Sequence, residues 1–97
     1  QAEQAAELLK ALSNPQRLRV MCLLFYGDPA VTEIYTEIEL SQSALSQHLA
    51  VLREAGVLAT RREAQTIFYR IADPAAVKVI ETLAAIFCPD KPARKKK

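Results

Sequence analysis

Glycine is scarce in this chain, which has only two glycines in 97 residues. With two glycines and five prolines the chain cannot form a collagen-like repeat, and a composition of 51% hydrophobic and 25% charged residues is not that of a disordered segment. The scarcity of glycine also excludes the glycine-rich phosphate loop that nucleotide-dependent enzymes use. The length predicts a single domain with one small core.

Long hydrophobic runs are also absent. The apolar stretch over residues 20–26 is far shorter than the roughly 18 residues that a membrane-spanning helix needs. No basic-then-apolar signal segment opens the sequence. Cysteine is equally rare, with only Cys22 and Cys88, so a disulfide framework is excluded. These features predict a cytoplasmic protein without a membrane partner.

The net charge of +2 is unevenly distributed. Residues 89–97 carry five basic residues against Asp90, which leaves eight basic and ten acidic residues in residues 1–88. Within that body, residues 41–72 contain four arginines against two glutamates. We therefore expect a domain over residues 1–88 with a modest basic surface, followed by a basic tail over residues 89–97. The tail is expected to be a solvated end, with non-specific attraction to DNA phosphates as its alternative role.

Three early segments have apolar residues at helical spacing: residues 1–12, 15–26 and 31–38. Asn14 and Pro15 supply a cap and a first-turn proline to the second of them. Ser41 is placed to cap a fourth helix that reaches Ala55, and Gly56 follows in the left-handed position that glycine tolerates best. In the second helix we expect one buried stripe: Leu18, Met21, Cys22 and Phe25.

After Gly56 the periodicity changes to that of strands. β-branched and aromatic runs over residues 57–60 and 66–71, joined by the polar residues 61–65, predict an antiparallel hairpin. Asp73-Pro74 then starts a last helix that ends near Phe87. Its apolar stripe is wide: Val77, Ile80, Leu83, Ala84 and Phe87, with Val79 and Ile86 beside it. Such a width, together with the leucines of the first helix (Leu8, Leu9 and Leu12), predicts a homodimer.

Two helices joined by a tight turn and followed by a hairpin make a winged helix-turn-helix, a mainly α fold whose second helix enters the DNA major groove. In residues 41–56 three leucines face inward: Leu45, Leu49 and Leu52. The residues left exposed are hydroxyls and amides that suit hydrogen bonds to base edges and phosphates: Gln42, Ser43, Ser46 and Gln47. An ordinary amphipathic helix explains the same periodicity, and a protein-interaction module is the alternative from another functional class.

The segments LSQSALSQHLAVLREAGVL and TRREAQTIFYRI resemble the recognition helix and wing of the ArsR/SmtB family of bacterial repressors, and LLKALSNPQRLRVMCLL resembles the entry to its second helix. The resemblance covers nearly the whole chain. It implies five helices and one hairpin, a homodimer through the first and last helices, a near-palindromic double-stranded DNA operator, and base contacts by the four polar residues named above. It also implies that the hairpin tip, residues 61–65, touches DNA through Arg61, Arg62 and Gln65.

Many members of that family sense metals, but the ligand patterns for such sites are missing here. Residues 31–40 contain no cysteine, and the last helix contains no histidine. The single histidine, His48, is interpreted as a packing or hydrogen-bonding residue that seats its helix. A nucleophile–base pair is not expected either, because Ser46 and His48 face different directions on one helix. We expect no metal, no cofactor and no enzymatic activity, with a metal-sensing family member kept as an alternative.

The two cysteines are the chemically distinctive side chains. Taken alone, Cys22 fits a small core residue and Cys88 an incidental terminal thiol. However, the MCLL segment and the FC ending resemble the BigR/SqrR/HlyU-like subgroup, which responds to persulfides or oxidants. That resemblance implies a redox-sensing pair, Cys22 and Cys88, joined directly or through added sulfur atoms, with loss of operator affinity. It leaves open whether the inducer is a reactive sulfur species or another oxidant, and whether the protein is a HlyU-like activator that displaces a silencer.

Overall fold

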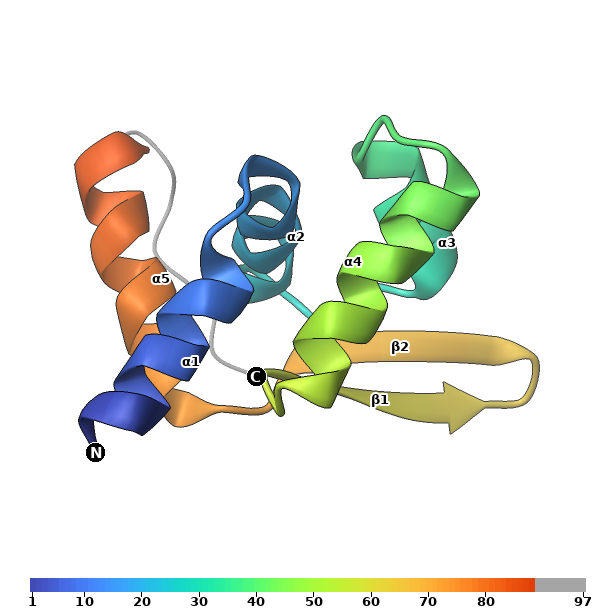
Figure 1. Cartoon of the computed structure of the whole chain (residues 1–97). Helices are drawn as coiled ribbons and strands as arrows, with labels where there is room; N and C mark the ends of the chain where they lie inside the picture. The colour runs from blue at the N-terminus through green and yellow to red at the C-terminus, as the bar shows by residue number, and fades with distance from the viewer. Residues whose placement is uncertain (89–97) are drawn as a thin grey trace.

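The computed structural model describes residues 1–88 of the chain and contains five helices and one hairpin (Figure 1). The elements in chain order are α1 (Ala2–Leu12), α2 (Pro15–Phe25), α3 (Val31–Glu37), α4 (Gln42–Glu54), β1 (Leu58–Glu63), β2 (Thr66–Ile71) and α5 (Pro74–Phe87). This order confirms the predicted winged helix-turn-helix. The predicted basic tail lies outside the described residues. Over the described part of the chain, none of the helices has both the length and the apolar character needed to cross a membrane.

The caps predicted from the sequence set the helix starts. The Asn14 side chain accepts hydrogen bonds from the backbone N–H groups of Gln16 and Arg17, at 2.8 and 3.1 Å. The Ser41 hydroxyl accepts one from the Ala44 N–H at 3.1 Å, and the Asp73 carboxylate likewise caps α5. Such caps are typically worth about 1 kcal/mol each, because the first N–H groups of a helix otherwise lack partners.

The hairpin is longer than the sequence indicated. The prediction that residues 61–65 form a polar link is wrong, because strand pairing continues to Glu63, opposite Thr66. The turn consists of Ala64 and Gln65 alone, with Ala64 in the left-handed region at φ 56°. Both faces of the hairpin are exposed near its tip, so polar side chains there are compatible with strand and carry no alternating pattern.

A second feature of the hairpin could not be anticipated from the sequence. The Tyr69 N–H donates to the Pro29 carbonyl at 3.0 Å, and Ala30 forms an isolated antiparallel bridge with Phe68. The loop before α3 therefore adds to the outer edge of β2. This contact anchors the start of α3 to the hairpin.

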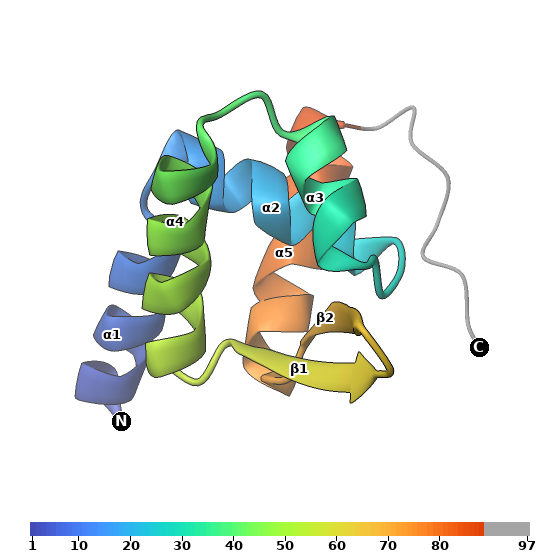
Figure 2. The same ribbon diagram turned by 90° about the vertical axis from the view of Figure 1, so that its right-hand side faces the viewer.

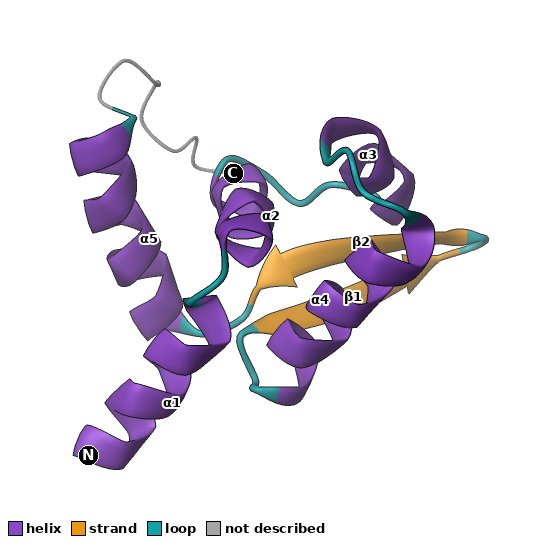
Figure 3. Cartoon of the chain, turned by 45° about the horizontal axis from the view of Figure 1, so that its top comes forward, coloured by secondary structure: helices purple, strands orange, loops and turns teal. Residues whose placement is uncertain are grey.

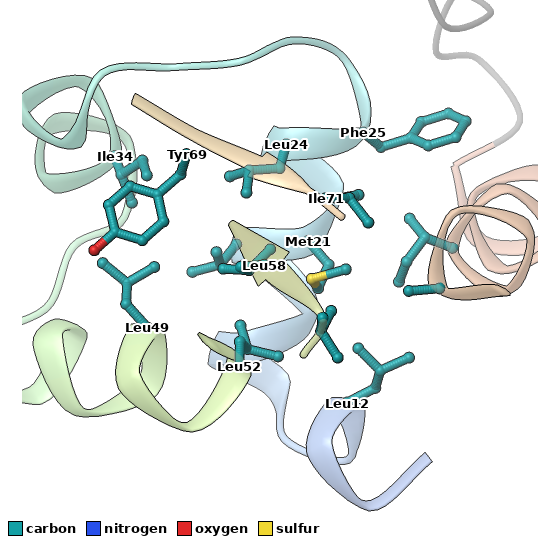
Figure 4. Close-up of a cluster of buried hydrophobic side chains, with 14 of the residues drawn as sticks. Leu12, Met21, Leu24, Phe25, Ile34, Leu49, Leu52, Leu58, Tyr69 and Ile71 are labelled. Carbon is teal, nitrogen blue, oxygen red and sulfur yellow. The ribbon is translucent and has the colours of Figure 1, made fainter. Parts of the chain in front are cut away.

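Helix α2 lies in the middle of the hydrophobic core (Figure 4). It packs against α1, α4, α5 and β2, so side chains around most of its circumference are covered. The predicted single stripe is therefore partly wrong. Met21 and Phe25 are buried as expected, but Val20 and Leu24 are also fully buried, while Leu18 and Cys22 are only half-buried.

Helices α1 and α5 lie on the side of the molecule opposite to the hairpin tip (Figures 1 and 3). Ile80 and Ala84 of α5 enter the core as predicted. Phe87 does not, and this part of the predicted stripe is wrong with respect to the chain's own core. At the end of α5, Phe87 and Ile86 are 75% and 62% exposed, and Leu9 of α1 is 56% exposed.

Candidate nucleic-acid interface

The first turns of α4 present a polar surface held over an apolar one. Leu45, Leu49 and Leu52 are at most 2% exposed, which confirms the predicted inner face of the helix. The predicted DNA-reading residues all lie on the exposed side: Gln42, Ser43, Ser46 and Gln47. In Figure 1 this end of α4 and the hairpin tip lie at the same end of the molecule, away from α5, and Figure 2 shows that end facing the viewer.

The serines of this surface are held by neighbouring hydroxyls. The Ser43 Oγ lies 3.5 Å from the Ser41 Oγ, and the Ser46 Oγ lies 3.2 Å from the Tyr35 hydroxyl of α3. Among the described residues, Gln42 and Gln47 make no side-chain hydrogen bond. The two amides are thus available to a ligand, while the Ser46 hydroxyl already has one partner. Tyr35 was not anticipated, because a single half-buried aromatic residue in a short helix carries no periodic signal.

His48 lies on the side of α4 that faces α2. Its ring is half-buried, and its Nδ1 atom is 3.3 Å from an NH group of Arg17. The interpretation of His48 as a hydrogen-bonding residue within the fold is therefore confirmed. Its partner, Arg17, was not anticipated, since 31 residues separate the two in sequence.

The arginines of the hairpin belong to β1 and not to a loop. Arg61 donates from Nε to Glu63 at 2.7 Å, and its guanidinium lies 4.4 Å from the centre of the Phe68 ring. Arg62 donates from Nε to the Ala64 carbonyl at 3.0 Å. Since successive residues of a strand point to opposite faces, Arg61 and Arg62 lie on opposite faces of the hairpin. Gln65 is exposed in the turn.

The two cysteines lie on helices that pack against each other. Cys22 is in α2, and Cys88 ends α5, where its N–H donates to the Ala84 carbonyl at 2.7 Å. Both are half-buried and neither forms a disulfide. Among residues 1–88 there is no group of three or more potential metal ligands from histidine, cysteine, aspartate and glutamate.

Comparisons with known proteins agree with this geometry. The sequence pattern of the family described as "Bacterial regulatory protein, arsR family" matches residues 14–60. The chain is similar to the "Biofilm growth-associated repressor" of Agrobacterium fabrum, at 49% identity over 87 residues that cover 90% of this chain and 74% of that protein. It is also similar to the "Transcriptional activator HlyU" of Vibrio cholerae, at 46% identity over 84 residues that cover 87% of this chain and 78% of that protein.

Solved structures show the same fold. A structure of HlyU from Vibrio cholerae has a TM-score of 0.87 and 45% identity, and covers 90% of this chain and 95% of that chain. Reduced HlyU gives a TM-score of 0.86 at the same identity, over 90% of this chain and 92% of that one. The transcriptional repressor BigR from Xylella fastidiosa gives a TM-score of 0.83 at 44% identity, over 90% of this chain and 89% of that chain.

Proposed function

Since this chain belongs to the ArsR family of bacterial regulatory proteins and is therefore a transcriptional regulator rather than an enzyme, we propose that it acts as a homodimeric repressor of a near-palindromic DNA operator. The observation that carries the proposal is the exposed polar surface of α4, which lies over a buried leucine face and at the same end of the molecule as the hairpin. A two-fold dimer would place its two recognition helices in half-sites about 10 base pairs apart, or a multiple of that spacing.

In this proposal α4 reads base edges. The exposed amides of Gln42 and Gln47 each offer a donor and an acceptor, which is the pairing that an adenine edge requires in the major groove. Ser43 and Ser46 contribute hydroxyls to bases or phosphates. Because the Tyr35 hydroxyl already lies beside the Ser46 Oγ, it limits the directions in which that hydroxyl can donate.

Replacing Gln47 by Ala is expected to weaken binding to the operator by about 1–3 kcal/mol, since one side chain that reads a base edge is lost. Ser46→Ala should act in the same direction. Affinity for a random duplex should change little, because phosphate contacts remain. Fluorescence anisotropy with both duplexes measures the difference, and Gln4→Ala on α1 is the matched control. Equal losses on the two duplexes would remove base reading from α4.

The hairpin is proposed to contact the DNA backbone through Arg61, Arg62 and Gln65. Arg61→Ala or Arg62→Ala should weaken binding to operator and random DNA alike and reduce the slope of log affinity against log salt by about 1. Arg19→Ala, an exposed arginine of α2, is the control and should leave the slope unchanged. A salt slope that none of the hairpin variants alters contradicts the assignment. The same salt series separates DNA binding from a protein-interaction role, which lacks the steep dependence.

We also propose that Cys22 and Cys88 form the sensor. One thiolate attacks the outer sulfur of a persulfide, takes that sulfur as Cys–S–SH and releases a thiolate. The second thiolate then attacks the cysteine sulfur of this group, forms the Cys–S–S–Cys bond and expels hydrosulfide. Overall, two cysteine thiols are oxidised, and the persulfide is reduced to a thiol and hydrogen sulfide. If both cysteines carry an added sulfur, the same attack leaves one sulfur atom in the bridge.

The packing of α2 against α5 supports this assignment, because a bond between the two cysteines would join the end of the proposed dimer helix to the central core helix. The relatives also support it, since a structure of reduced HlyU has been solved. An activator role, in which the protein displaces a silencer, remains the alternative outcome at the promoter, because HlyU is named a transcriptional activator.

A further inference from the structure

Arg17 connects three helices. Its Nε donates to the carbonyl of Ala11 in the last turn of α1 at 2.6 Å, and its NH1 lies 3.3 Å from the Nδ1 of His48 in α4. Its own backbone belongs to the first turn of α2. One guanidinium thus contacts the end of α1 and the middle of the helix that carries the proposed DNA-reading residues. Figure 2 shows α1, α2 and α4 adjacent on one side of the molecule.

The contact with α1 satisfies a backbone group that the helix leaves unpaired. The last carbonyls of a helix have no intrahelical donor. In α1, the Lys10 carbonyl accepts from the Ser13 N–H and the Leu12 carbonyl accepts from the Asn14 N–H. The Ala11 carbonyl between them accepts from Arg17, and Ala11 itself is only 6% exposed. This bond holds the guanidinium in one place.

The contact with α4 defines the role of His48. A guanidinium is always a donor, so the Nδ1 of His48 must accept, which requires the neutral ring with its proton on Nε2. The buried leucines of α4 make apolar contacts, which are non-directional and permit small rotations of the helix. A hydrogen bond from a side chain fixed on another element is directional. It therefore restricts the rotation of α4 about its own axis.

We propose that Arg17 and His48 are positioning residues for operator recognition: the hydrogen bond between them sets the rotation of α4 and thereby the direction of the adjacent Gln47. This inference rests on the proposed reading role of α4. It explains why a polar pair joins two helices next to a continuous apolar core. It also connects α1, a proposed dimer helix, directly to the reading helix.

The test uses the whole chain and two substitutions of His48. His48→Leu fills a similar space but has no acceptor, and His48→Asn keeps an acceptor oxygen close to the position of Nδ1. The probe is a duplex selected by the parent chain from a randomised pool, compared with a random duplex, and thermal unfolding is followed in parallel. We expect His48→Leu to bind the selected duplex about tenfold more weakly, the effect of losing one hydrogen bond to a charged group. His48→Asn should retain affinity close to that of the parent.

A double-mutant cycle shows whether the pair acts as a unit. Arg17→Lys keeps the charge but cannot reach Ala11 and His48 with a rigid fork, so alone it should also weaken binding. In the His48→Leu background it should cause little further loss of preference for the selected duplex. Additive losses, or a His48→Leu chain that discriminates like the parent, overturn the inference and leave the proposed function standing. A parent chain that selects no duplex at all overturns the proposed function itself.

Discussion

Phe87→Glu is expected to convert the proposed dimer into a monomer. Phe87 is 75% exposed at the end of α5 and Ile86 is 62% exposed beside it, so the single chain leaves a large apolar end uncovered. Aromatic residues at the centre of an interface commonly contribute about 2 kcal/mol or more. Two-fold symmetry counts each substitution twice, so the dissociation constant of the dimer should rise about a thousandfold.

Sedimentation equilibrium measures the dimer, and anisotropy with the operator measures the consequence. Loss of the dimer should abolish high-affinity operator binding, because one subunit can occupy only one half-site. Phe87→Leu, which keeps an apolar side chain, is the matched control and should remain dimeric. The proposal fails if Phe87→Glu associates like the parent chain, or if the parent is itself a folded monomer at micromolar concentration.

The second large effect is expected from the thiols. Treatment with a persulfide donor should weaken operator binding 5- to 150-fold, which corresponds to a coupling of about 1–3 kcal/mol between the sensor and the DNA surface. Dithiothreitol should restore binding. The magnitude is plausible for this fold because α2, which carries Cys22, packs against both α5 and α4. A bond between Cys22 and Cys88 can therefore shift the recognition helices without any contact with DNA.

Single serine variants separate this switch from general oxidation. Cys22→Ser and Cys88→Ser should each bind the operator like the reduced parent and ignore the donor, because each variant lacks one of the two sulfurs. Mass spectrometry of the treated parent distinguishes a direct disulfide, which loses two hydrogens, from a bridge that has gained sulfur. If both variants respond to the donor as the parent does, the cysteines return to ordinary packing roles.

These two experiments address different elements of one design. The apolar end of α5 brings two subunits together, and the thiols tie that same helix to α2. A substitution that prevents dimerisation should therefore remove operator binding whatever the redox state. The cysteine substitutions should leave the dimer and its operator affinity intact and remove only the response. The order of the two outcomes shows whether sensing acts through the dimer.

The sequence by itself determined the features that depend on neighbouring residues. Asn14, Ser41 and Asp73 cap their helices because each capping oxygen needs only N–H groups two or three residues ahead. Gly56 adopts φ 79° because a helix ending there requires a left-handed residue. The leucine spacing of α4 likewise defined its buried face and, with it, the exposed position of Gln47.

Only the tertiary structure decided the features that depend on distant residues. The buried sector of α2 is wider than one stripe because four elements surround that helix. The partners of Ser46 and His48 are Tyr35 and Arg17, side chains 11 and 31 residues away, and no local pattern encodes such pairs. Hydrogen bonds between side chains need positions matched to a few tenths of an ångström, and that match exists only after the helices have packed.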